Sequence, residues 1–173
     1  MLISIGRREQ KGDVIDLLLE CHGRIRTFVT MARATGESQG REAHELVDAC
    51  ARVERYFTEA LPLHVQDEEE SLLPRLQGRR ADVDRALASM HAQHEAHRPL
   101  LEAMLGAAGA LRQSPGDPAL LASLAGAARR LELDFQKHLD LEENLLFPAA
   151  RELLEEAERA DILGELRARR QRP

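Results

Sequence analysis

Apolar residues recur every three to four positions along most of this chain, which is the period of an amphipathic α-helix. The spacing predicts a first helix from Asp13, as its N-cap, to about residue 36. A second helix is expected over about 38–78, bent rather than ended by Pro62. A third is expected over about 82–111, with a kink at Pro99.

The clearest loop is the segment 112–118, which ends with Asp117 as an N-cap and Pro118 at the first helical position. A fourth helix follows directly, and no alternating strand pattern competes anywhere. We therefore predict an all-α protein with one domain over 1–173. Its core is an up-down-up-down four-helix bundle over about 13–147, followed by a C-terminal helical extension over about 148–170.

Composition agrees with a helical core. Hydrophobic residues make up 43% of the chain and aromatic residues only 3%, so the core must consist mainly of Leu, Ala, Ile and Val. The formal net charge of -6 excludes an ordinary nucleic-acid-binding role. A basic run at the C-terminus is expected to offset a helix dipole; it consists of Arg167, Arg169, Arg170 and Arg172.

Cysteine usage and the lack of long apolar segments indicate the compartment. Only Cys21 and Cys50 occur, without C-x-x-C spacing, which is typical of a reducing compartment. The apolar run within residues 1–8 is too short for a signal peptide, and no apolar stretch of membrane-spanning length follows. We expect a cytoplasmic protein with no membrane association.

Two helical stripes are interrupted by histidine and glutamate at a spacing of four residues. Extending the apolar face of the second helix leads to His64 and Glu68, and extending that of the fourth leads to His138 and Glu142. Each pair therefore lies on one inward face. Buried carboxylates are costly unless a positive partner lies beside them, so this pattern predicts a metal site.

The two segments also repeat each other. HVQDEEESLLP, beginning at His64, matches HLDLEENLLFP, beginning at His138, at a constant offset of 74 residues, with His, Glu, Glu, Leu and Pro in common. One H-x-x-x-E motif is weak evidence for a metal site, but two copies with shared flanks are strong evidence. His22 and His94 lie in phase with the apolar stripes of the first and third helices, so every helix contributes to the predicted set.

The remaining histidines and neighbouring acids have simpler interpretations. His44 lies off its helical stripe and is expected at the surface, whereas His91 and His97 remain alternative ligands, with His91 the better candidate. Four acids are expected on a solvated face: Asp67, Glu69, Glu70 and Glu143. Glu69 and Glu143 recur in both repeats, so either could also orient a ligating histidine.

Four imidazoles and two carboxylates without a thiolate suit iron better than structural zinc; manganese or zinc is less expected. Two octahedral ions offer about twelve coordination positions, of which these six side chains fill about eight. The open positions could accept an oxo, hydroxo, dioxygen, peroxide or nitric oxide ligand. A ferritin-like centre is excluded because no histidine here has Glu three residues before it.

These residues resemble the hemerythrin-like HHE family over nearly the whole chain, through Glu20-Cys21-His22, the two H-x-x-x-E-E segments and His94. The resemblance implies a four-helix bundle with a non-haem, carboxylate-bridged di-iron centre. It also implies that His22, His64, His94 and His138 are terminal ligands, with Glu68 and Glu142 bridging. Met90 stands four residues before His94, where oxygen-carrying members have a second histidine, so the chain looks more like the four-His, two-Glu branch.

Three functions remain open at this level. The leading one is a di-iron protein that binds, senses or detoxifies a small diatomic or peroxide ligand. The second is a di-iron enzyme that turns over peroxide or nitric oxide or donates iron to damaged centres, with Tyr56 or the cysteines as redox relays. The third is a metal-stabilised regulatory or interaction module. The apolar stripe of the terminal helix could also mediate a homodimer.

Overall fold

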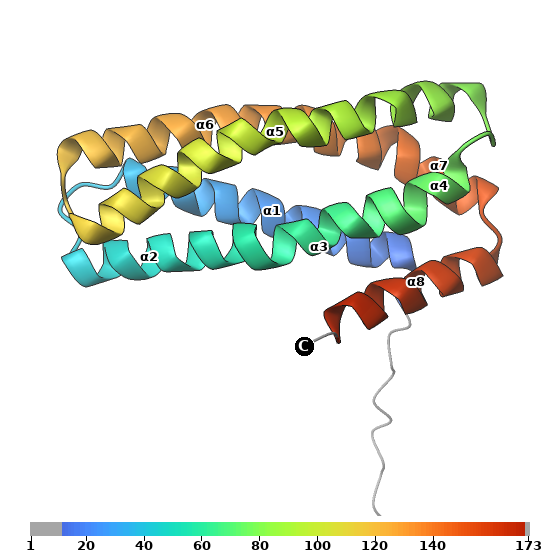
Figure 1. The fold of residues 1–173 in the computed structure, drawn as a ribbon, viewed down its shortest axis with the longest axis horizontal. Helices are drawn as coiled ribbons and strands as arrows, with labels where there is room; N and C mark the ends of the chain where they lie inside the picture. Colours follow the sequence, from blue (N-terminus) through green and yellow to red (C-terminus); the bar gives the residue numbers. More distant parts are fainter. Residues whose placement is uncertain (1–11, 172–173) are drawn as a thin grey trace, which may run out of the picture.

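The computed structural model describes residues 12–171, and every regular element within that range is helical. Four long helical paths lie side by side, each antiparallel to the next along the chain, and a fifth helix folds back along one end (Figure 1). The first path is α1 (Val14–Gly36) and the third is α5 (Ala81–Gln113). The second comprises α2 (Ala43–Arg55), η1 (Tyr56–Ala60), α3 (Leu61–Gln66), η2 (Asp67–Leu72) and α4 (Leu73–Leu76). The fourth comprises α6 (Pro118–Leu141), η3 (Glu142–Leu146) and α7 (Phe147–Leu153), and α8 (Glu156–Arg170) follows it.

The paths surround a common core. α1 contacts α2 and α6, and α5 contacts the same two helices, so each path has two neighbours. Together with the chain reversals visible in Figure 1, this arrangement confirms the predicted up-down-up-down bundle. Within residues 12–171, no helix is both long and apolar enough to cross a membrane. The apolar run within residues 1–8 lies outside the described residues.

Several helix ends follow directly from the local sequence. The Asp117 side chain accepts hydrogen bonds from the backbone N–H groups of Ala119 and Leu120 at 2.8 and 3.2 Å, and Pro118 opens the helix, as predicted. At the start of α1, the Asp13 backbone N–H donates to Asp16 at 3.2 Å. These caps satisfy helix groups that would otherwise lack partners.

Each of three wide π-helical turns is followed by a proline. η1, η2 and η3 precede Pro62, Pro74 and Pro148, which stand at the second residue of the next α-helical segment. A proline ring clashes with the carbonyl one turn earlier, and a widened turn moves that carbonyl away. The helical path therefore continues through Pro62 and Pro148. α5 likewise runs through Pro99 as one helix.

The break between the fourth path and the terminal helix lies a few residues after the boundary expected near 148. The fourth path continues through α7 to Leu153, and the chain leaves helical geometry at Leu154, which has φ -95° and ψ 133°. α8 begins only at Glu156. Pro148 follows the π-helical turn η3 and does not end the helix. The helix ends at Leu154, a residue type that gives no helix-ending signal in the sequence.

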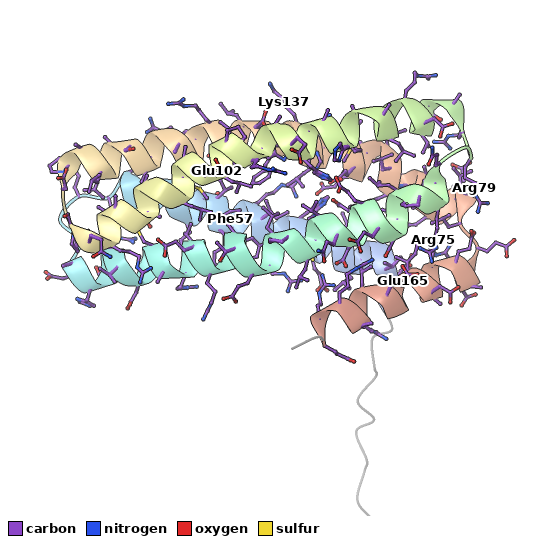
Figure 2. All side chains as sticks on the ribbon, viewed as in Figure 1. Phe57, Arg75, Arg79, Glu102, Lys137 and Glu165 are labelled. Carbon is purple, nitrogen blue, oxygen red and sulfur yellow. The ribbon has the colours of Figure 1, made fainter. Side chains whose placement is uncertain are left out.

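The core consists of two apolar clusters separated along the bundle axis. One includes Val29, Phe57, Met104 and Leu131, and the other includes Leu18, Leu72, Met90 and Leu146. Figure 2 shows Phe57 inside the bundle and Lys137 on its outer face. On each of the four paths, one or two of the predicted metal ligands fall between the two clusters in sequence. A polar layer therefore divides the core.

The terminal helix packs on its own bundle. Ile162 and Leu166 are fully buried within the second cluster, and α8 contacts α1 and η2. This docking uses apolar residues that the sequence left available for a homodimer. Dimerisation through the terminal helix stays a prediction.

Candidate metal centre

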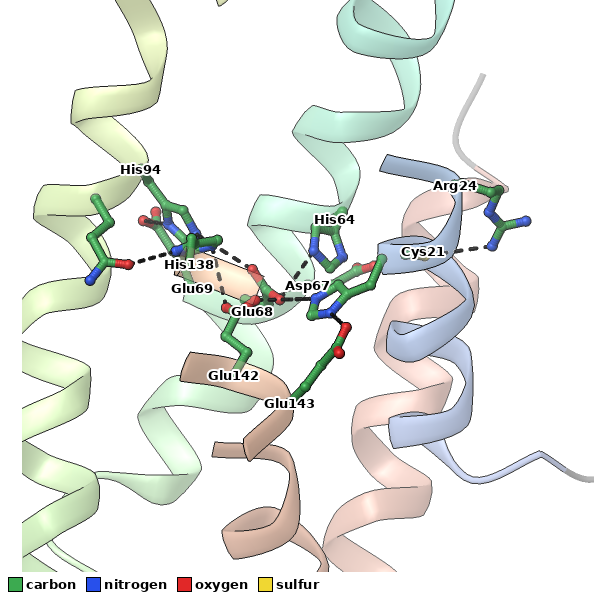
Figure 3. Close-up of polar contacts among 12 residues, drawn as sticks. Cys21, Arg24, His64, Asp67, Glu68, Glu69, His94, His138, Glu142 and Glu143 are labelled. Atoms are coloured by element: carbon green, nitrogen blue, oxygen red, sulfur yellow. Dashed lines mark hydrogen bonds and ion pairs between the residues drawn. The ribbon is translucent and has the colours of Figure 1, made fainter. Parts of the chain in front are cut away.

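The polar layer brings together all six predicted ligands. Ligand atoms of His22, His64, Glu68 and Glu142 lie within 4.8 Å of one another, and so do those of Glu68, His94, His138 and Glu142. Both sets contain the same two glutamates, and each adds one pair of histidines. Figure 3 shows the labelled members of these sets converging from different helices: His64, Glu68, His94, His138 and Glu142. The arrangement is two adjoining sites with a shared carboxylate edge.

Glu68 faces both histidine pairs. Its Oε1 atom lies 3.2 Å from Nε2 of His64 and 3.8 Å from Nε2 of His22, whereas Oε2 lies 3.5 Å from Nε2 of His94. One carboxylate oxygen is therefore directed to each side of the layer.

Glu142 does the same from the opposite helix. Its Oε2 atom lies 3.1 Å from Nε2 of His22, and its Oε1 atom lies 3.5 Å from Nε2 of His138. A carboxylate that offers separate oxygens to two positions suits a bridge between two cations.

Most of the converging atoms have no hydrogen-bond partner. Within residues 12–171, the buried side-chain polar atoms without one are Nε2 of His22, both ring nitrogens of His64, and both carboxylate oxygens of Glu68 and of Glu142. Leaving such atoms unsatisfied costs about 1–3 kcal/mol each. Native proteins satisfy nearly all buried polar groups, so this concentration in one place fits bound cations.

Outer hydrogen bonds orient three of the histidines. Nδ1 of His22 donates to Glu143 at 2.8 Å, and Nδ1 of His94 donates to Glu69 at 2.8 Å. These contacts confirm the hypothesis that Glu69 and Glu143 orient core histidines. With the hydrogen on Nδ1, the lone pair on Nε2 points to the centre and can bind a metal.

Gln93 was not identified from the sequence. Its side-chain oxygen accepts a hydrogen bond from Nδ1 of His138 at 2.8 Å, so it orients the third histidine as Glu69 and Glu143 orient the other two. Gln93 differs in type from those glutamates and lies outside the repeated segments. Only its position next to His94 could have indicated it.

The pKa values of the four core histidines shift in two opposite directions. Burial alone lowers the pKa of His22, but the nearby carboxylates of Glu142 and Glu68 outweigh burial and raise it to about 10. Burial also opposes charge on His94, and Glu68 raises its pKa to about 9. Burial lowers the pKa of His138 to about 3 and also lowers that of His64.

The pKa values of the two glutamates also shift in opposite directions. Burial raises the pKa of Glu142, and the neighbouring charge of Glu68 raises it further, to about 8. Burial also opposes charge on Glu68, but His64 and His22 hold its pKa below the usual range. Without a cation, the layer therefore retains protons to limit repulsion between the two carboxylates.

Two of the three other histidines are placed differently from expectation. His44 is exposed, as predicted. The His91 side chain is 76% exposed, whereas His97 is buried with Nε2 3.3 Å from Asp134 and its ring 4.9 Å from that of His138. His97 is therefore nearer the centre than His91, which reverses the predicted order. Neither belongs to the two ligand sets.

The expected position of Asp67 is wrong. It was expected on a solvated face, but it is fully buried, and its carboxylate oxygens lie 2.9 Å from Arg169 and 2.6 Å from Arg170. The basic C-terminal run therefore does more than offset a helix dipole; Arg172 lies outside the described residues. Helical periodicity could not reveal this contact because the covering helix is remote in sequence.

A small cavity adjoins the centre. Its volume is about 40 Å³, and His64, His94, His97 and His138 form one part of its lining. The rest is apolar and includes Ile25, Leu61, Val65, Leu101, Phe135 and Leu139. A cavity of this size holds one or two small molecules and no larger substrate.

A four-helix bundle with histidines and shared carboxylates in its core defines a class of cation-binding helical proteins. The family model described as the hemerythrin HHE cation-binding domain matches residues 13–150, and a second match covers 89–171. The chain therefore belongs to the hemerythrin HHE cation-binding family. No curated protein matches it.

Proposed function

We propose that this protein binds two non-haem iron ions in its core and there binds, senses or detoxifies dioxygen, peroxide or nitric oxide. His22 and His64 would hold one ion, His94 and His138 would hold the other, and Glu68 and Glu142 would bind both. The observation that carries the proposal is the direction of the carboxylate oxygens. Each glutamate presents one oxygen to each histidine pair.

The donor set favours iron over zinc. It contains imidazole nitrogens and carboxylate oxygens, and neither Cys21 nor Cys50 belongs to the two ligand sets. Structural zinc sites are closed tetrahedra that often include thiolates, whereas this set leaves about four of twelve octahedral positions open. An iron pair would supply reversible redox chemistry and positions for an added ligand.

The cavity supports a small, weakly polar ligand. It adjoins three of the four core histidines, and its remaining wall is formed by aliphatic and aromatic side chains. Such a lining favours uncharged molecules of two or a few atoms and disfavours ordered water. His97 is the polar side chain outside the ligand sets that reaches this space, so it could donate a hydrogen bond there.

The two cysteines support a reducing compartment. Both are free and buried, and burial raises the pKa of the Cys50 thiol to about 11. A neutral, enclosed thiol is inert towards disulfide exchange. We propose a cytoplasmic location, because neither cysteine forms a disulfide.

Iron stoichiometry tests the centre itself. Wild-type protein reconstituted with ferrous iron without oxygen is expected to bind about two irons per chain, as counted from the two adjoining sets. Glu142→Ala is expected to lose most of this iron, because one change removes a donor from both positions. His44→Ala removes an exposed imidazole and should retain wild-type content. Wild-type protein without bound iron would contradict the proposal.

Ligand binding is tested separately on the iron-loaded protein. Addition of nitric oxide to the reduced form, or of peroxide or dioxygen, should change its visible absorption spectrum in a saturable manner. The same additions to iron-free protein provide the control. Iron-loaded protein with spectra unaffected by all three ligands would leave a cation-binding protein without the proposed oxidant chemistry.

A further inference from the structure

Residues beside the ligand Glu68 make polar contacts that the corresponding residues of the second repeat cannot make. Asp67 and Ser71 are both fully buried on η2, the π-helical turn that carries Glu68. Their counterparts in the second repeat are Leu141 and Leu145, which are apolar. The repeated motif is therefore complete without a polar residue at these two positions. Asp67 and Ser71 have a role that only the first repeat needs.

That purpose is contact with α8. Oδ1 of Asp67 lies 2.9 Å from Nη1 of Arg169, and Oδ2 lies 2.6 Å from Nη2 of Arg170. Two arginines from one helix therefore bind the two oxygens of one enclosed carboxylate. Charge-assisted hydrogen bonds of this kind are short and directional, so they restrict the position of both partners.

A second group of contacts lies one turn further along. The Arg169 guanidinium also donates to Oγ of Ser71 at 2.7 Å, and Ser71 donates to Glu165 of α8 at 2.5 Å. Arg75 then binds Glu165 at 2.6 Å. Figure 2 shows Arg75 and Glu165 facing each other between α4 and α8. The polar contacts thus span the whole π-helical turn.

Apolar packing places α8 against the same two elements. Ile162 and Leu166 are buried together with Leu72, which follows Glu68 on η2, and Leu18, which precedes His22 on α1. The elements that α8 contacts therefore carry His22 and Glu68, two members of the same ligand set.

We propose that α8 is a positioning element of the metal centre: the Asp67–Arg169–Arg170 cluster holds the turn that presents Glu68, so docking of α8 and occupancy of the centre stabilise each other. This inference rests on the proposed cation binding. Arg169 and Arg170 act through Asp67 and the backbone of η2, and they contact no ligand atom of the two sets. Groups that orient metal ligands in this way change metal affinity by about 10–100-fold.

Coupling of this kind is reciprocal. If docking of α8 strengthens iron binding by a given factor, iron binding must strengthen docking by the same factor. Iron loading should therefore slow hydrogen exchange of the α8 backbone amides, a measurement that needs no substitution.

The variant test removes the two positive charges. The double variant Arg169→Gln with Arg170→Gln is expected to weaken ferrous iron binding by about tenfold or more. In this variant, iron loading should no longer slow the hydrogen exchange of the α8 amides to the extent expected for the wild type. Arg169→Lys with Arg170→Lys keeps the charges and should retain most of the affinity. Arg79→Gln is the matched control, because Arg79 joins Glu158 of α8 in an exposed ion pair at 2.6 Å far from the ligands.

The outcomes separate this inference from the proposed function. Iron binding by the wild type with unchanged exchange in α8 overturns the coupling alone. Equal iron affinity in the Gln variant and the wild type also overturns it. Wild-type protein that takes up no iron overturns both proposals. If the Gln variant does not fold, the exchange experiment on the wild type decides the question.

Discussion

At the scale of single residues, the four core histidines fall into two kinds. His22 and His94 each have a carboxylate on Nδ1. Burial opposes charge on both rings, but the carboxylates of Glu68 and Glu142 near Nε2 raise their pKa values to about 10 and about 9. His64 and His138 lack a carboxylate on Nδ1, and burial lowers their pKa values. Each predicted cation position thus has one charged and one neutral imidazole at pH 7 when no cation is bound.

Cation binding should therefore release protons and weaken as the pH falls. A ligating imidazole must be neutral, so His22 and His94 must each lose a proton, and so must Glu142, whose pKa is raised to about 8. We expect affinity for ferrous iron to rise steadily from pH 6 to pH 8. Titration calorimetry in buffers of different ionisation enthalpy should detect two to three released protons, on the order expected for coupled sites.

The same protons stabilise the cation-free fold on the acid side. The folded pKa values of His22 and His94 lie above the ordinary value of 6.5, so their contribution is complete below about pH 6.5 and is lost as the pH rises through 9 to 10. Affinity for iron that does not change between pH 6 and pH 8 would contradict the assigned protonation states.

At the scale of elements, the contact between α1 and α6 depends on one glycine. Gly36 ends α1 against α6, where a Cβ atom would lie 2.4 Å from the backbone nitrogen of Ala125 and 2.7 Å from the backbone oxygen of Leu121. These obstacles are backbone atoms of a packed helix and cannot rotate away. α1 and α6 can therefore approach this closely only with glycine at position 36.

Gly36→Ala should lower the free energy of unfolding. Overpacking of this kind costs about 1–3 kcal/mol, because one of the helices must shift. Gly106→Ala provides the control, since Gly106 lies within α5 with no atom near its Cβ position, and it should stabilise by about 0.5–1 kcal/mol. Urea denaturation of both variants measures the difference. Equal midpoints for Gly36→Ala and the wild type would show that α1 and α6 have room to separate.

The π-helical turns link local sequence to the centre. Glu68 lies within η2 and Glu142 begins η3, and each of these turns is followed by a proline of the repeated segment. Wide turns of this kind are common at functional sites, where they redirect a side chain. The shared proline of the two repeats therefore has a structural reason: it accompanies the turn that carries the shared glutamate.

At the scale of the whole molecule, a polar layer divides an otherwise apolar core. Burying two carboxylates without a cation is unfavourable, so the cation-free fold carries a cost that the two apolar clusters must offset. Any ligand that binds only the folded chain stabilises it in proportion to the logarithm of its concentration.

Removal of the cation should therefore lower the melting temperature. Free iron at 100 times its Kd adds about 2.7 kcal/mol per site, which corresponds to about 5–11 °C for a domain of this size. The double variant Glu68→Gln with Glu142→Gln should show no such increase, because it lacks the carboxylates that both ligand sets share. Calorimetric melting of both proteins tests this. An equal increase in both would place the cation elsewhere.

Sequence alone determined the bundle and the inward direction of six side chains. Helical periodicity is a local property, so the phase of His22, His64, Glu68, His94, His138 and Glu142 relative to apolar neighbours was sufficient to predict that they meet in the core. The loop around Asp117 and Pro118 was equally local. That the six inward side chains bind iron stays a prediction.

Only the tertiary structure decided which atoms face one another. Gln93 became visible through its contact with His138, Asp67 through the arginines of α8, and His97 through its burial beside the centre. Each of these depends on a helix far away in sequence, whose rotation and offset are set by packing of the whole core. The pattern of one helix shows which face is covered, but not what covers it.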